Sequence, residues 1–194
     1  MALNVGIYLY DHAEVLDFSG PFEVFSTANR LVAEPVFNVF LVGETGTQIQ
    51  ARGGFQVSPG YGFHNCPAID ILVVVGGVHT QELQKPKVID WVASVGAQAQ
   101  LVASVCTGAF LLAQAGAIQQ ETVTTHWEDI ADLRRDFPNL TVVENTPWVD
   151  QGRIVTSAGI SAGIGMSLHL VSRLHSLELA TRTARQMEFD WLPL

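Results

Sequence analysis

The chain has 194 residues, of which 48% are hydrophobic and 15% are charged, a composition typical of one compact globular domain and not of a disordered chain. Its 19 acidic and 10 basic side chains give a formal net charge of −9, which argues against nucleic acid as the main partner. The N-terminus lacks the positive region of a signal peptide, and the apolar stretch 101–118 is interrupted by polar residues. We therefore expect a cytoplasmic protein without a membrane span.

Short apolar, β-branched runs alternate with amphipathic runs along the chain. In chain order, the predicted elements are a strand at 3–8, a helix at 20–33, strands at 36–43, 48–52 and 71–75, a helix at 87–96, a strand at 101–105, a helix at 107–115, a strand at 122–125, a helix at 128–135, a strand at 140–143, a hairpin of 148–149 and 153–156, and helices at 161–174 and 177–187. Proline at the first helical position is favoured, so Pro21 is taken as the start of the first helix. The alternation predicts a mainly parallel sheet with helices on both faces, in a single domain over residues 1–194.

Cys106 lies where the predicted strand 101–105 gives way to a helix. Ligand sites of open α/β sheets lie at the carboxyl ends of strands, and a helix N-terminus favours the thiolate form of a cysteine. The helix dipole contributes about 0.3–1 kcal/mol, or ~2 kcal/mol when partly buried, so a strongly acidic thiol needs further donors. Gly108 permits a tight turn, as in a nucleophile elbow. From spacing alone, a buried structural cysteine fits equally well.

Three further positions at strand ends carry chemistry. Asp17 is enclosed by apolar residues, and burial beside a thiol would raise its pKa and let it donate a proton; local sequence slightly favours a turn or cap aspartate instead. The pair Gly76-Gly77 is typical of an oxyanion site and equally of a plain tight turn. His126 beside Trp127 fits a packed histidine as well as a site residue.

Two other residue types carry no predicted chemistry. Cys66 lies in a loop before the strand 71–75 with no helix after it, and we expect a structural role. The six histidines show no metal-ligand spacing, so no metal site is predicted.

Taken together, these segments resemble the DJ-1/PfpI (ThiJ) superfamily, whose fold is a class I glutamine-amidotransferase-like, flavodoxin-like three-layer α/β sandwich. The resemblance covers nearly the whole chain and is carried, in order, by residues 16–21, 75–77, 104–108, 124–127 and 157–163. Within the superfamily the chain is most similar to isonitrile hydratases, and next to the amidotransferase-like domains of AraC-type regulators.

The resemblance implies a lyase that hydrates a small isonitrile to an N-formamide through a covalent thioimidate. It implies that Cys106 is the nucleophile, Asp17 the general acid and Thr107 an assisting residue. The oxyanion and substrate-binding residues that it implies are Gly76, Gly77, His126, Trp127 and Ile160. It implies no metal or organic cofactor, and a homodimer that acts on a small molecule, with no membrane or nucleic-acid partner.

Two alternatives stay open: a small-molecule-sensing domain related to AraC-type regulators, and a glyoxalase-like stress protein that uses the same cysteine on a dicarbonyl. The regulators carry helix-turn-helix motifs after this domain, whereas this sequence stops at Leu194 with no basic extension, so we expect no DNA binding through it; a longer native reading frame would restore that role. The chain departs from the family at Val75, where proline is usual, and at Gly165, where an acidic residue is common. Thr107 stands where protease-like members have histidine, which removes an adjacent general base, so peptidase activity is not expected.

Overall fold

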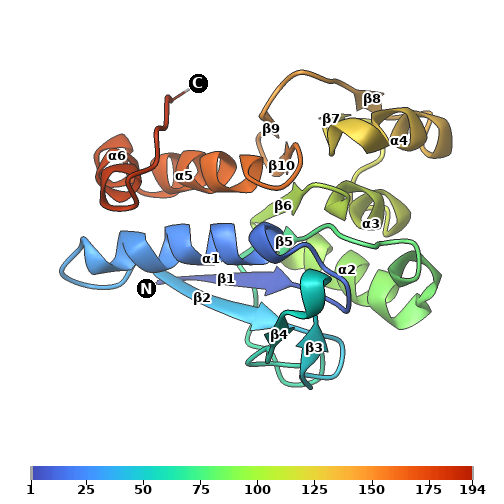
Figure 1. The fold of residues 1–194 in the computed structure, drawn as a ribbon, viewed down its shortest axis with the longest axis horizontal. Coiled ribbons are helices and arrows are strands. Elements are labelled where there is room, and N and C mark those ends of the chain that lie inside the picture. The colour runs from blue at the N-terminus through green and yellow to red at the C-terminus, as the bar shows by residue number, and fades with distance from the viewer. Residues whose placement is uncertain (1, 194) are drawn as a thin grey trace.

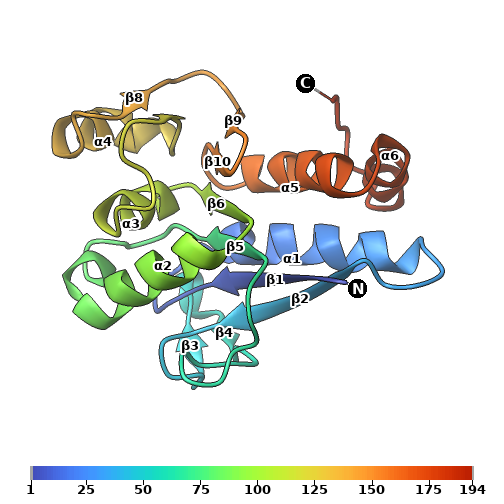
Figure 2. The same cartoon turned by 180° about the vertical axis from the view of Figure 1, so that it is seen from behind.

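The computed structural model describes residues 2–193 and has a central six-stranded sheet (Figures 1 and 2). The strand order is β2-β1-β5-β6-β10-β9, and every neighbouring pair is parallel except β9 and β10. The strand bounds are β1 Leu3–Tyr8, β2 Phe37–Val42, β5 Ile71–Val74, β6 Leu101–Val105, β9 Trp148–Gln151 and β10 Ile154–Ser157. The predicted class, a mainly parallel α/β sandwich, is confirmed.

Helices cover both faces of this sheet. Their bounds are α1 Val15–Arg30, α2 Pro86–Gln98, α3 Gly108–Gln114, α4 Ile130–Asp136, α5 Ala162–Leu174 and α6 Leu177–Gln186. Helices α1, α5 and α6 pack on one another on one face, while α2 and α3 pack together on the other (Figures 1 and 2). Every residue of β5 and β6 is buried, as expected for apolar strands that are covered on both sides. In residues 2–193, no helix combines the length and apolar character needed to cross a membrane.

Smaller elements lie outside the main sheet. Strands β3 (Ile49–Gln50) and β4 (Gln56–Val57) form an antiparallel pair around the 3₁₀ turn η1 (Arg52–Gly54). Strands β7 (Thr122–Val123) and β8 (Thr141–Val142) form a separate parallel pair. Two further 3₁₀ turns are η2 (Glu82–Gln84) and η3 (Trp127–Asp129).

The predicted start of the first helix at Gly20-Pro21 is wrong. Helix α1 already begins at Val15, and Pro21 lies buried inside it. A Cβ on Gly20 would come within 2.9 Å of Ile164 on α5, so the glycine marks a close helix–helix contact and not a helix start. The earlier start places Asp17 in the first turn of α1 and directs its carboxyl group toward the sheet.

Gly108 lets the start of α3 pack directly on the end of β5. A Cβ at this position would collide with the Val74 carbonyl oxygen, so Gly108→Ala forces the elbow away from the sheet. We expect the free energy of unfolding, measured by urea titration, to fall by about 1–3 kcal/mol. Gly60→Ala is the matched control, because a Cβ there meets nothing within 4 Å, and we expect a change within about 0.5 kcal/mol. Equal effects of the two substitutions would contradict this packing argument.

Candidate active site

Cys106 occupies a strained turn between β6 and α3. Its φ of +56° lies in the left-handed region that residues other than glycine rarely adopt. Surrounding bonds hold this conformation: the Cys106 N–H donates to the Ala158 carbonyl at 3.3 Å, and Thr125 Oγ1 donates to the Cys106 carbonyl at 2.8 Å. A Cβ on Gly76 would lie 2.8 Å from the Cys106 Cβ, so only glycine leaves room for the elbow. The predicted nucleophile-elbow geometry is present.

The elbow faces a cavity of about 470 Å³. Cys106 is only 6% exposed, and it lines this cavity together with other residues that the sequence singled out, namely Gly77, Thr107, His126, Trp127 and Ile160. The sulfur is therefore buried against the core and still open to a space that a small molecule can occupy.

Further lining residues were missed by the sequence analysis. They are Glu14, Arg52, Val78, His79, Thr80, Glu128 and Asp129. All but Arg52 lie within three residues of a predicted motif, so proximity in sequence was a usable signal. Arg52 comes from the η1 turn between β3 and β4, and nothing in the sequence connects this turn with the cysteine.

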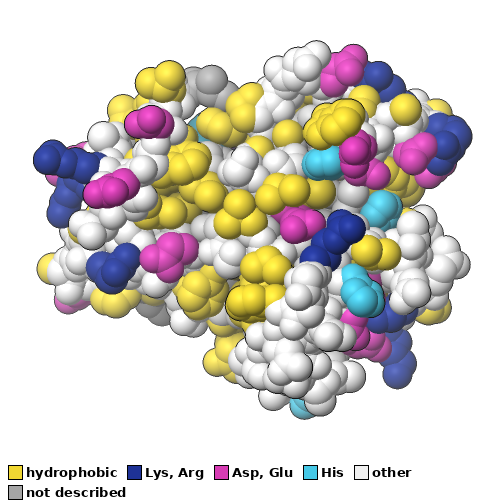
Figure 3. Space-filling model, in the orientation of Figure 1, with side chains coloured by type: hydrophobic (Ala, Val, Ile, Leu, Met, Phe, Trp, Pro, Cys, Tyr) yellow, Lys and Arg dark blue, Asp and Glu magenta, His cyan; other side chains and the backbone are white. Residues whose placement is uncertain are grey.

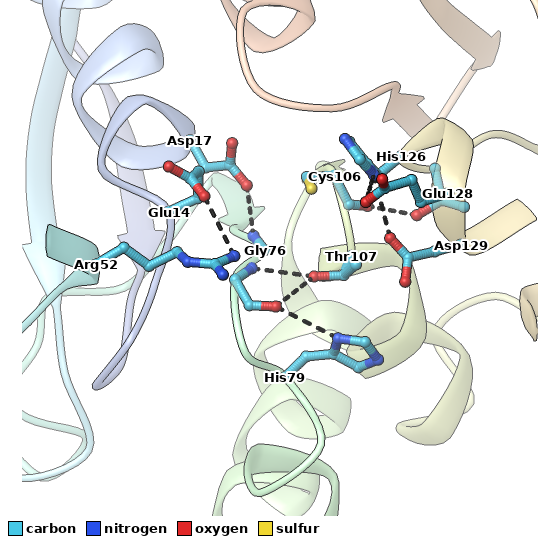
Figure 4. A network of polar contacts seen from close by, with 12 residues as sticks. Glu14, Asp17, Arg52, Gly76, His79, Cys106, Thr107, His126, Glu128 and Asp129 are labelled. Carbon is cyan, nitrogen blue, oxygen red and sulfur yellow. Dashed lines mark hydrogen bonds and ion pairs between the residues drawn. The ribbon is translucent and has the colours of Figure 1, made fainter.

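Asp17 lies fully buried beside the elbow and does not itself line the cavity (Figure 4). Its Oδ2 accepts a hydrogen bond of 3.0 Å from the Gly76 N–H, while Oδ1 has no hydrogen-bond partner among residues 2–193. Burial raises the pKa of Asp17 to about 7, although the Gly76 N–H and the Cys106 side chain act in the opposite direction. Near neutral pH this carboxyl can therefore both hold and release a proton.

The expected preference of Cys106 for the thiolate form is outweighed by burial. Burial, with the Asp17 carboxylate as the next cause, raises the pKa of the Cys106 thiol to about 12. The backbone amides of Thr107 and Ile160 act in the opposite direction and lower this pKa, but they do not offset the desolvation. The carboxyl and the thiol thus form one coupled acid–base pair, which shares a single proton once the first has been lost near neutral pH.

The turn at Gly76-Gly77 positions the side chains of the site. The Gly76 N–H is bonded to Asp17, and the Gly77 N–H donates to Thr107 Oγ1 at 3.0 Å. Thr107 Oγ1 in turn donates to the Gly77 carbonyl at 3.1 Å (Figure 4). Both glycine N–H groups are engaged within the protein, so their role as oxyanion donors stays a prediction.

Two charged pairs lie on opposite sides of the cysteine (Figure 4). On one side Arg52 contacts Glu14 at 3.5 Å, and on the other the His126 imidazole lies 3.3 Å from Asp129 and 3.9 Å from Glu128. Burial lowers the pKa of the nearby His79, so that imidazole is neutral at physiological pH. No group of three or more His, Cys, Asp or Glu side chains suited to a metal ion occurs in residues 2–193.

Comparison with known proteins places this site in a family. The profile of the DJ-1/PfpI family matches residues 4–173. The chain belongs to the DJ-1/PfpI family. It is 33% identical over 194 residues to an isonitrile hydratase of Pseudomonas putida, covering all of this chain and 81% of the relative.

Regulators and solved structures of the same family also match. The chain is 28% identical over 187 residues to the HTH-type transcriptional regulator GbdR of Pseudomonas aeruginosa, covering 96% of this chain and 51% of the regulator, so it spans about half of that protein. A ThiJ/PfpI family protein from Pseudomonas syringae has a TM-score of 0.88 at 22% identity, covering 100% of this chain and 77% of the other. Drosophila melanogaster DJ-1beta has a TM-score of 0.84 at 19% identity, covering 98% and 100%. These structures confirm the fold.

The buried carboxyl leads to a prediction about stability. Because the folded-state pKa of Asp17 is raised from 3.8 to about 7, its carboxylate destabilises the fold increasingly as pH rises between these values. Asp17→Asn keeps an acceptor for the Gly76 N–H and removes the buried charge. At pH 8 we expect the variant to be more stable than wild type by up to about 4 kcal/mol, with the gain vanishing near pH 4. Urea titrations at both pH values test this, and a pH-independent difference would contradict it.

Proposed function

We propose that the protein hydrates small isonitriles to N-formamides, with Cys106 as nucleophile and Asp17 as the acid that donates and recovers the proton. The observation that carries the proposal is the buried carboxyl–thiol pair, whose thiol lines the cavity while the carboxyl lies behind it in the core. The similarity to an isonitrile hydratase over the whole length of this chain supports the same reaction.

The first step adds the thiol across the isonitrile carbon. When the shared proton lies on Asp17, the sulfur is a thiolate, and the backbone amides of Thr107 and Ile160 favour this form. Its lone pair attacks the terminal carbon of R–N≡C and forms the C–S bond. The Asp17 carboxyl delivers its proton to the same carbon, which leaves the neutral thioimidate R–N=CH–S and an Asp17 carboxylate.

Water resolves this intermediate. The water oxygen adds to the thioimidate carbon, the Asp17 carboxylate accepts a water proton, and the carboxyl transfers it to nitrogen, giving R–NH–CH(OH)–S. The C–S bond then breaks as the hydroxyl proton returns to the Asp17–Cys106 pair, and R–NH–CHO leaves. Thr107 lines the cavity next to Cys106, and its hydroxyl oxygen, which accepts one hydrogen bond from the Gly77 N–H, keeps a second lone pair that can accept from the water.

Loss of the nucleophile is the direct test of this reaction. We expect Cys106→Ser to lower kcat/KM for isonitriles by about 10³-fold or more, because a serine hydroxyl in the same place is a far weaker nucleophile. Cys66→Ser is the matched control and should retain wild-type turnover, since Cys66 does not line the cavity. Formamide release is followed by chromatography, and a wild-type protein that turns over none of a panel of isonitriles would refute the proposal.

The coupled pair also predicts the pH profile. Below pH 7 the pair carries two protons, and the arrangement of neutral acid with thiolate is depleted. For an uncharged isonitrile, kcat/KM should therefore rise about tenfold per pH unit below pH 6 and level off above pH 8. A profile that is flat from pH 5 to 9 would contradict the role of Asp17.

One observation favours a second candidate, a sensing domain. The transcriptional regulator GbdR is 28% identical and similar over 96% of this chain. Binding of a small molecule by calorimetry without turnover would favour sensing. Cys106-dependent consumption of methylglyoxal in the same panel would instead favour a glyoxalase-like activity.

A further inference from the structure

The rim of the cavity has an excess of negative charge. Four side chains with a formal charge line it, and two of them, Arg52 and Glu14, pair with each other at 3.5 Å. Glu128 and Asp129 have no lysine or arginine partner among residues 2–193, and both share the single His126 imidazole. One imidazole cannot neutralise two carboxylates in either protonation state. The rim therefore keeps at least one uncompensated negative charge.

An aromatic face accompanies these carboxylates. Trp127, the residue before Glu128 and Asp129, lines the cavity and is 75% exposed. Figure 3 shows acidic and histidine side chains gathered beside exposed hydrophobic surface at the α4 end of this face. Tryptophan and carboxylates together form the recognition chemistry of an ammonium group, because both attract a cation while the ring also tolerates its alkyl carbons.

The negative field reaches the reactive sulfur. Asp129 is one of the groups that raise the pKa of Cys106, so its charge acts on the thiol across the cavity. A cation seated against Asp129 reverses the sign of this effect and favours the thiolate. The volume of about 470 Å³ also exceeds what an unsubstituted small isonitrile fills.

We propose that Trp127, Glu128 and Asp129 select cationic substrates, namely isonitriles whose R group carries an ammonium centre. The class of reaction rests on the proposed hydratase function, while the charge selection rests on the rim alone. An anionic substrate is disfavoured, because the guanidinium of Arg52 is already paired with Glu14. The net charge of −9 also attracts cations in general, so a test has to separate this overall effect from the local effect of the rim carboxylates.

The test labels Cys106 with methanethiosulfonates of three charges, in a Cys66→Ser background. The thiolate attacks the reagent's sulfenyl sulfur, a disulfide forms, and methanesulfinate leaves. The probes are the trimethylammonioethyl, methyl and sulfonatoethyl reagents. The rate of each reagent with the protein is divided by the rate of the same reagent with free 2-mercaptoethanol, which removes differences in intrinsic reactivity. At low ionic strength we expect the cationic reagent to react about tenfold or more faster than the anionic one, and the ratio to fall with salt.

Matched variants separate the rim from the net charge. Glu128→Gln should lower the ratio about threefold, whereas Glu178→Gln, an equal charge change at an exposed position on α6, should leave it within about 20%. Trp127→Leu should slow only the cationic reagent, by about threefold. Equal normalised rates for the three reagents, or equal effects of the two glutamate variants, would overturn charge selection.

An enzymatic arm distinguishes this failure from failure of the proposed function. Three isonitriles with the same chain length carry a trimethylammonium, tert-butyl or carboxylate end. We expect the lowest KM for the cation, and a higher KM for it alone in Glu128→Gln. If none of the three is hydrated, the hydratase proposal fails, and the labelling rates still decide the charge selection.

Discussion

The burial of one carboxyl group beside one thiol is the constraint on which the rest of the site depends. Asp17 has no access to solvent, and its oxygen Oδ1 has no partner in the part of the chain that the structure describes. Such a group is stable near neutral pH only because it can take up a proton. Cys106 faces the same desolvation, so neither group ionises independently of the other. The pair stores one transferable proton next to a thiol, which is what the proposed addition to an uncharged carbon requires.

The parallel sheet makes this pair possible. Strand β5 lies between β1 and β6, so the segments that follow these three strands meet at one edge. Asp17 follows β1, the Gly76-Gly77 turn follows β5, and Cys106 follows β6. The turn joins the other two, because its N–H groups bond to Asp17 on one side and to Thr107 on the other. Glycine is required there, since a Cβ on Gly76 would lie against the elbow backbone.

The floor and the rim of the cavity differ in their electrostatics. The thiol at the floor is desolvated and shares a proton with the carboxyl behind it, whereas the rim carries the exposed Glu128 and the half-buried Asp129 of η3, with an ion pair across from them. A ligand therefore meets charge before it meets the sulfur. This separation is compatible with the proposed substrates, in which the reacting carbon is uncharged and the rest of the molecule carries a charge.

Much of the fold was predictable from local patterns. The fully apolar runs of β5 and β6 have the composition of buried parallel strands, and Cys106 follows one of them directly, so its place at the edge of the sheet follows from the sequence. The start of α1 was not predictable, because Gly20-Pro21 has the composition of a helix start and its actual role depends on Ile164 of α5, 144 residues away.

The protonation of the thiol and the makeup of the rim were likewise decided by tertiary structure. A helix N-terminus favours a thiolate, but desolvation by the surrounding core outweighs it, and burial is a property of the packed molecule and not of the turn. Arg52 reaches the cavity only because the β3–β4 hairpin, which follows β2 in the chain, folds against Glu14 at the start of α1. The sequence by itself determined which residues stand at the strand ends; only the packing of distant elements decided their charges, since solvation and Coulomb interactions depend on distance in space.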